Sequence, residues 1–180
     1  MAKPSVGIVF DADMGNSIDD ALALALLYGI ESKSEARVVS LSTTKSTLKS
    51  AAFLEALQKF FFGRPLPVGM PETGKDTRVT PMLAAVADKY PNTIKQLNDT
   101  ADPAPAIRNA FTAHHDGNCI VLLAGPATNL ASALALPRVW EPALRQEDAE
   151  RRARIPTLSR LPREARAGHD SRFPARSAPL

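Results

Sequence analysis

Apolar segments of two kinds alternate along residues 6–136, and this order constrains the fold more than any other feature of the chain. Short β-branched runs are typical of strands buried on both faces, and longer runs of good helix formers are typical of helices. Strands are expected at residues 6–10, 37–42, 66–70 and 119–124. Helices are expected at residues 21–28, 46–62, 81–90, 106–114 and 127–136. The alternation predicts the α/β class, with a parallel sheet covered by helices on both faces.

Glycine and proline set the expected ends of several elements. Gly29 stands where a left-handed residue would end the first helix, and Gly63, with Pro65 just beyond, is expected to end the second. Gly15 is the residue that permits a bend in the loop after the first strand.

That loop carries the strongest chemical signal. Its sequence, DADMGNSIDD at residues 11–20, holds four carboxylates and no His or Cys. Such closely spaced like charges repel unless something positive neutralises them, and an all-oxygen donor set favours Ca²⁺ or Mg²⁺ over zinc. The alternative is that these residues cap the helix and solvate the loop. Because ligands bind at the carboxyl ends of parallel strands, the loops after Phe10, Ser42 and Leu123 should converge on one site.

Two separated motifs resemble one enzyme family. IVFDADMG at residues 8–15, followed by DDALA at residues 19–23, resembles the N-terminal signature of the inosine-uridine type, calcium-dependent nucleoside hydrolases. LLAGPATNLA at residues 122–131 is similar to that family's Gly-Pro-x-Thr-Asn-Leu-Ala segment, which follows a central strand. The resemblance covers residues 5–137. It implies a Rossmann-like sheet and a salvage glycosidase that hydrolyses ribonucleosides to ribose and free base.

The resemblance also implies roles for individual residues. The implied calcium ligands are Asp11, as a supporting carboxylate, together with Asp13, Asp20 and the backbone carbonyl of Ala124. Asp13 would also be the general base that takes a proton from metal-bound water, and Asp19 would bind the ribose hydroxyls. The spacer at residues 16–18 is longer than in the commonest form of the motif, which leaves open whether Asp19 or Asp20 reaches the metal. The implied cofactor is Ca²⁺ and the implied substrate a small nucleoside.

Composition changes abruptly after residue 137. Residues 138–180 carry ten Arg, no Lys and six acidic residues, net +4, whereas residues 1–137 have a net charge of −1. The family's later motifs do not occur there. We therefore expect an incomplete nucleoside hydrolase-like domain over residues 1–137 and an Arg/Pro-rich tail, disordered or read out of frame, over residues 138–180. Such a chain should be weakly active or inactive, and the open edge of its half-sheet predicts poor solubility or self-association.

Other classes of function stay open. An apolar strand followed by Asp11-x-Asp13 also resembles the haloacid dehalogenase type phosphatases, with Asp11 as nucleophile, Asp13 as general acid and Mg²⁺ between them. A non-catalytic, vestigial binding protein is the third class. Nucleic acid is not an expected partner, because Trp140 and Phe173 are the only aromatic residues of the basic tail. The longest apolar run, residues 21–28, is too short to cross a bilayer and no signal-peptide segment precedes the first strand, so a cytoplasmic protein is expected.

Overall fold

The computed structural model describes residues 6–61 and 65–137. Its strands are β1 (Val6–Ala12), β2 (Ala36–Thr43), β3 (Val68–Gly69) and β4 (Cys119–Ala124). Its helices are α1 (Asp19–Ser32), α2 (Leu48–Phe60), α3 (Pro81–Lys89), α4 (Pro103–Thr112) and α5 (Thr128–Ala135), with a short 3₁₀ helix at Leu97–Asp99. The expected tail at residues 138–180 and the expected helix end at Gly63 lie outside the described residues.

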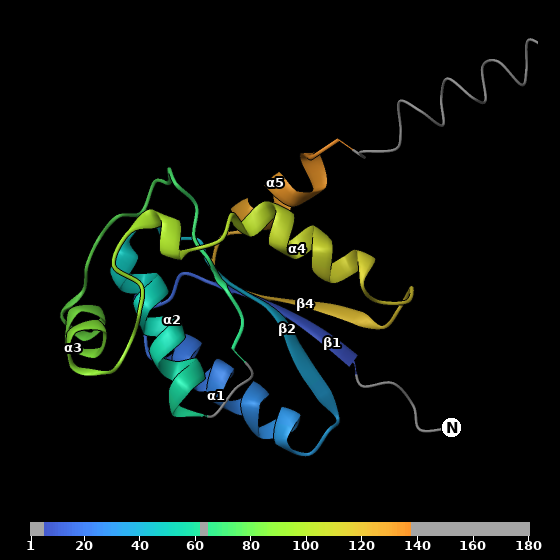
Figure 1. The fold of residues 1–180 in the computed structure, drawn as a ribbon, viewed down its shortest axis with the longest axis horizontal. Coiled ribbons are helices and arrows are strands. Elements are labelled where there is room, and N and C mark those ends of the chain that lie inside the picture. The colour runs from blue at the N-terminus through green and yellow to red at the C-terminus, as the bar shows by residue number, and fades with distance from the viewer. Residues whose placement is uncertain (1–5, 62–64, 138–180) are drawn as a thin grey trace, which may run out of the picture. The chain divides into compact units, whose positions relative to one another are not determined.

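The strands form one four-stranded sheet in the order β3-β2-β1-β4, and every neighbouring pair is parallel. The sheet is flanked by helices, with α1 and α2 on one face and α4 and α5 on the other (Figure 1). The predicted α/β class with a Rossmann-like parallel sheet is confirmed. No helix in the described ranges is both long enough and apolar enough to span a bilayer.

Alternate residues of β1 enter two separate cores. Ile8 and Phe10 pack with α1 and α2, whereas Val9 packs with α4 and α5 around Ile107. Because both faces of β1 are covered, its apolar residues need no polar alternation. The central strand is thereby fixed from both sides, and its carboxyl end is held in place.

A buried carboxylate joins α2 to the segment after α3. Glu55 accepts hydrogen bonds from Thr93 N and Thr93 Oγ1, both at 2.7 Å, and pairs with Lys59 Nζ at 2.7 Å. Burial acts to raise the pKa of Glu55, but the Lys59 and Thr93 contacts outweigh it and lower this pKa below its ordinary value. Glu55 therefore stabilises the fold in its ionised form.

Two expected helix boundaries are wrong. Helix α1 continues through Gly29 to Ser32, and the left-handed residue that follows it is Ser34, with φ of 59°. Glycine permits a left-handed end but does not require one, so the helical hydrogen bonds continue past it. Helix α4 begins at Pro103 rather than after Pro105, because Asp102 accepts a hydrogen bond from Ala104 N at 3.0 Å as an N-cap and proline suits the first helical position.

Candidate functional site

The loops after β1, β2 and β4 meet at the carboxyl edge of the sheet, as the topology predicts. They enclose, with residues 71–76, a cavity of about 350 Å³. Its polar lining consists of Asp13, Thr44, Thr73, Lys75, Asp76, Thr128, Asn129 and Ser132. These side chains supply hydroxyl, amide, carboxylate and ammonium groups within a lining that is otherwise apolar, and such a combination can orient a small ligand that carries hydroxyl groups.

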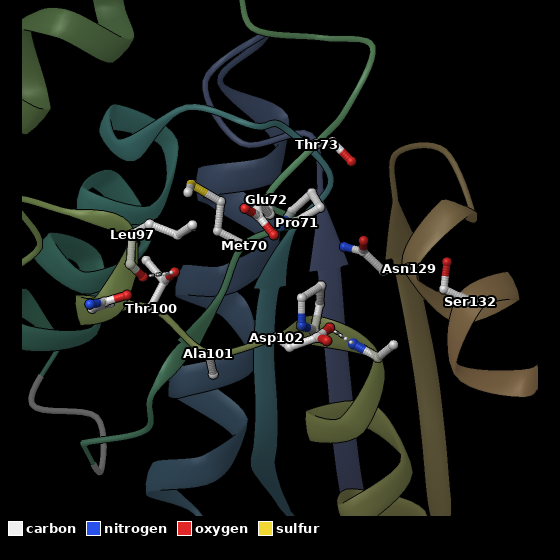
Figure 2. A pocket seen from close by; sticks show the side chains of 13 residues that line it. Met70, Pro71, Glu72, Thr73, Leu97, Thr100, Ala101, Asp102, Asn129 and Ser132 are labelled. Atoms are coloured by element: carbon white, nitrogen blue, oxygen red, sulfur yellow. Dashed lines mark hydrogen bonds between the residues drawn. The ribbon is translucent and has the colours of Figure 1, made fainter. Parts of the chain in front are cut away.

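A second cavity of about 480 Å³ adjoins the first and shares four lining residues with it: Pro71, Thr73, Asn129 and Ser132. Figure 2 shows its lining: the segment around Met70 and Glu72 on one side, and α5 on the other. The shared residues place the two cavities next to each other along the carboxyl edge.

Asp11 lies below the cavity rather than in its wall. Its side chain is fully buried, and Oδ1 accepts hydrogen bonds from Ser42 Oγ at 2.7 Å and from Asn129 Nδ2 at 2.9 Å. The other oxygen, Oδ2, is buried without a hydrogen-bond partner in the described part of the chain. Burial raises the pKa of Asp11, and the Ser42 and Asn129 hydrogen bonds oppose that shift. Asp11 thus acts as an acceptor that ties β1 to β2 and α5.

Asp13 and Asp20 lie together, whereas Asp19 does not join them. Asp20 is buried in the first turn of α1. Its burial, and to a smaller extent the negative charges of Asp13 and Asp19, raise the pKa of Asp20 to about 7. Its Oδ2 atom is buried and finds no hydrogen-bond donor among the described residues. Asp19 is exposed and accepts a hydrogen bond from Ser17 Oγ. Of the two neighbouring carboxylates, Asp20 is therefore the one that faces Asp13.

The end of β4 lies in close contact with Asp13. The carbonyl oxygen of Ala124 accepts a hydrogen bond from Asp13 N at 3.3 Å. A Cβ atom on the next residue, Gly125, would lie 2.7 Å from Asp13 N and 3.1 Å from Asp13 Cβ. Only glycine allows this approach, so the sequence Ala-Gly-Pro places a backbone carbonyl beside the acidic loop.

The acidic loop turns at Gly15, whose φ of 97° confirms the predicted bend. The Gly15 carbonyl accepts a hydrogen bond from Thr80 Oγ1 at 2.5 Å, and the Met14 carbonyl accepts one from Ser50 Oγ at 2.8 Å. Ser50 of α2 and Thr80, the N-cap residue of α3, thus hold the loop in one conformation.

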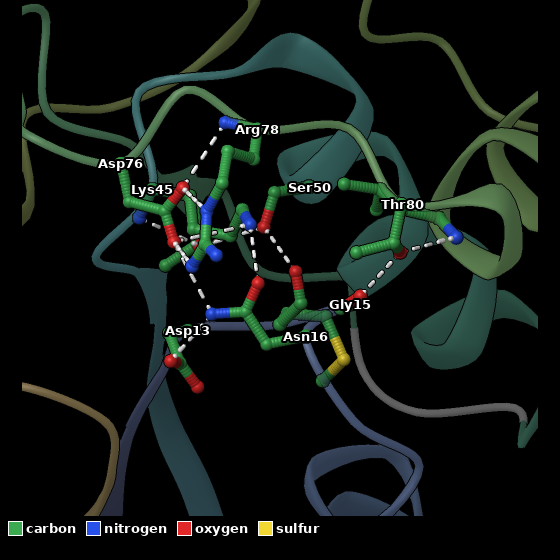
Figure 3. A network of polar contacts seen from close by, with 11 residues as sticks. Asp13, Gly15, Asn16, Lys45, Ser50, Asp76, Arg78 and Thr80 are labelled. Carbon is green, nitrogen blue, oxygen red and sulfur yellow. Dashed lines mark hydrogen bonds and ion pairs between the residues drawn. The ribbon is translucent and has the colours of Figure 1, made fainter.

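A polar network links this loop to residues 76–78 (Figure 3). Lys45 is fully buried, and its Nζ donates to Asn16 Oδ1 at 2.6 Å and to Asp76 Oδ2 at 3.3 Å. Arg78 pairs with Asp76 at 3.0 Å, and this contact holds the pKa of Asp76 well below its usual range. Both cations pair with Asp76, so the network brings one net positive charge to the acidic loop, and Arg78 acts electrostatically on Asp13. That single charge does not balance the four carboxylates of the loop.

The donor set partly fits a hard cation. Asp13, Asp20 and the Ala124 carbonyl offer only oxygen atoms. Asp20 Oδ2, which has no hydrogen-bond partner in the part of the chain that the structure describes, is the kind of buried oxygen that Ca²⁺ binds. Within residues 6–61 and 65–137, no group of three or more His, Cys, Asp or Glu side chains is close enough together to hold a metal ion. Asp11 therefore does not complete a three-carboxylate site, and water or ligand oxygens would have to fill the remaining positions.

Comparison with known proteins adds no relative: no protein-family model matches the chain, and neither does any curated protein. The nucleoside hydrolase resemblance of the two motifs therefore stays a prediction.

Sequence reasoning missed three residues that organise the site: Lys45, Asp76 and Asn129. Asn129 lies within the second motif, and its Nδ2 donates both to Asp11 Oδ1 and to the carbonyl of Thr43, each at 2.9 Å. The need for positive charge near the acidic loop is the signal that could have directed attention to Lys45.

Proposed function

We propose that the smaller cavity is the ribose subsite of an N-ribosyl hydrolase of the inosine-uridine type. The observation that carries the proposal is the position of Asp13: it lines a cavity of about 350 Å³ whose other polar groups are mostly hydroxyls and amides. Buried Asp20 and the Ala124 carbonyl lie beside Asp13. A sugar that must be held by hydroxyl contacts next to a carboxylate suits this lining.

Asp13 acts as general base in this proposal. Asn16 Nδ2 donates to Asp13 Oδ2 at 2.7 Å, so Oδ1 is the oxygen assigned to accept a proton from the attacking water. Ca²⁺, held by Asp13, Asp20 and the Ala124 carbonyl, would position the ribose diol and lower the pKa of that water. The water oxygen bonds to C1′, the C1′–N bond breaks, and its electron pair leaves with the base.

The departing base needs a proton from a general acid. No histidine lines either cavity within the described residues. His114 lies near the opposite edge of the sheet, where its ring contacts Gly7 at the start of β1. We therefore expect the 180-residue chain to release base slowly, with solvent as the proton source.

The phosphatase alternative receives no support from the geometry. Its nucleophile would be Asp11, which is fully buried, accepts two hydrogen bonds at Oδ1 and lines neither cavity. The second oxygen, Oδ2, is buried as well, so neither oxygen is open to a phosphoryl group in the cavities.

Calcium titration calorimetry and product analysis on the 180-residue chain test the proposal. Asp13→Asn and Asp20→Asn should each lower calcium affinity by at least about tenfold, because each removes a charged ligand. Asp116→Asn, at an exposed site on the turn before β4, should leave the affinity unchanged. Incubation with inosine and uridine should release free base in an Asp13-dependent reaction.

The outcomes separate the three classes of function. Equal calcium affinities in the three variants would refute the metal assignment. Phosphate release from a phosphomonoester without base release would support the phosphatase class. Calcium and nucleoside binding without any turnover would indicate a binding protein.

A further inference from the structure

The side-chain amide of Asn16 has a partner for each of its polar groups. Its Oδ1 accepts from Lys45 Nζ at 2.6 Å. Its Nδ2 donates to Asp13 Oδ2 at 2.7 Å and to Asp76 Oδ2 at 3.2 Å. Figure 3 shows Asn16 between the carboxylate of Asp13 and the Lys45–Asp76 pair.

Only one of the two orientations of this amide is compatible with its surroundings. Rotating the amide by 180° would place its NH₂ group against the Lys45 ammonium and its carbonyl oxygen against two carboxylates. Every favourable contact would become a repulsive one, because an ammonium only donates and an ionised carboxylate only accepts. Lys45 is the group that excludes a donor at the Oδ1 position.

The burial of Lys45 strengthens its effect on the orientation of the Asn16 amide. Its side chain is fully enclosed, so water cannot replace the ammonium as a donor to Asn16. Asp76, its ion-pair partner, is in turn held by Arg78 through Nε at 3.1 Å and through Nη2 at 3.0 Å. The ammonium is therefore also held by a carboxylate oxygen that itself contacts the Asn16 amide.

We propose that Lys45 is a positioning residue for Asp13: its buried ammonium fixes the Asn16 amide so that Nδ2 donates to Asp13 Oδ2. The carboxylate then keeps one rotamer, with Oδ1 available for chemistry in the cavity. The proposal rests on the proposed function only for the role of Asp13 as base. The contacts themselves do not depend on a nucleoside or on calcium.

Side-chain amide hydrogen exchange measured by NMR tests the proposal on the 180-residue chain. In Lys45→Met, exchange of the Asn16 NH₂ protons should become about tenfold faster or more, as expected for loss of a charged hydrogen-bonded arrangement. The ¹³Cγ signal of Asp13 should shift in the same variant. Lys49→Met, which breaks an exposed ion pair with Asp88, is the matched control and should change neither signal.

The buried amide of Asn129 is the internal reference, since it lies at the same sheet edge but does not contact Lys45. Its exchange should stay within about twofold of wild type in Lys45→Met. Equal acceleration at Asn16 and Asn129 would show that Lys45 only stabilises the fold, and unchanged Asn16 exchange would show that the amide is fixed without it. Either result overturns the proposal.

A milder variant serves if Lys45→Met does not fold. Asp76→Asn acts on the partly exposed side of the network and removes the carboxylate that Asn16 and Lys45 share. It should accelerate exchange at Asn16 while leaving Asn129 unchanged, and no difference between the two amides would contradict the proposal. Because no readout uses calcium or nucleoside, a chain that cleaves no substrate can still support the role of Lys45.

Discussion

Replacing Asn129 tests the hydrogen bonds that join α5 to the ends of β1 and β2 beneath the site. Asn129 is 4% exposed, and its Nδ2 serves two buried acceptors, the Asp11 carboxylate and the Thr43 carbonyl. Asn129→Ala leaves both without this donor, next to an Asp11 Oδ2 that already has no partner in the described region. A hydrogen bond to a charged group contributes about 1.5–3 kcal/mol and a neutral one about 1 kcal/mol, so the free energy of unfolding should fall by about 2.5–4 kcal/mol.

Urea denaturation followed by circular dichroism measures this loss. With a slope of about 1–3 kcal/mol per M, the unfolding midpoint should fall by about 1–4 M without a large change in slope. Asn98→Ala, at an exposed position of the 3₁₀ helix, should stay within about 0.5 kcal/mol of wild type. If the two variants were equally stable, the hydrogen bonds of Asn129 would not hold α5 to the sheet and the reasoning would be wrong.

Three further predictions concern other parts of the chain. Because the folded-state pKa of Glu55 is lowered, the stabilisation that its carboxylate provides is present above the unfolded pKa of about 4.3 and is lost as the pH falls below that value and through the folded pKa. Glu55→Gln should therefore be less stable than wild type near neutrality and approach it in acid, which thermal melts at a series of pH values measure. Gly125→Ala should lower the free energy of unfolding by about 1–3 kcal/mol, because its Cβ would lie 2.7 Å from a backbone nitrogen of the acidic loop. Gly29→Ala, in open space on α1, should raise that free energy by up to about 1 kcal/mol. A loss of stability at both positions would contradict this reasoning. Leu122 on β4 is 39% exposed, so Leu122→Lys should reduce the concentration-dependent self-association of the chain, as measured by sedimentation velocity. Val79→Lys, at another exposed apolar residue, is the control. Equal self-association of the two variants would show that β4 is not the surface through which copies of the chain associate.

Local sequence signals were sufficient for the class of fold and for most elements. β4 has the expected bounds because its apolar run is short and ends at the Gly125-Pro126 pair. Strand β3 was harder to predict: residues 66–70 read as a strand, but only Val68–Gly69 pair with β2. Pairing depends on the neighbouring strand, which a five-residue pattern does not contain.

The acidic loop could be located from sequence, but the contacts that shape it could not. Asp13, Asp20 and the end of β4 follow from motifs placed at strand ends. Lys45 reaches Asn16 across 29 positions of sequence, and Asp76 reaches it across 60. Such side-chain pairings depend on how the segment after β3 passes over the sheet edge, and no periodicity or composition signal encodes that path.

The strand order also determines when the site can form. The neighbours of β1 are β2, which follows it closely in sequence, and β4, which follows much later. The hydrogen bond between Asn129 and Asp11 spans 118 positions, so it closes one of the longest loops in the described chain. During synthesis from the N-terminus, the β1–α1–β2 unit emerges and can fold while Asp11 is still hydrated and one edge of β1 is unpaired. The acidic loop acquires its final environment only when α5 docks, so the last-made segment of the described unit completes the cavity.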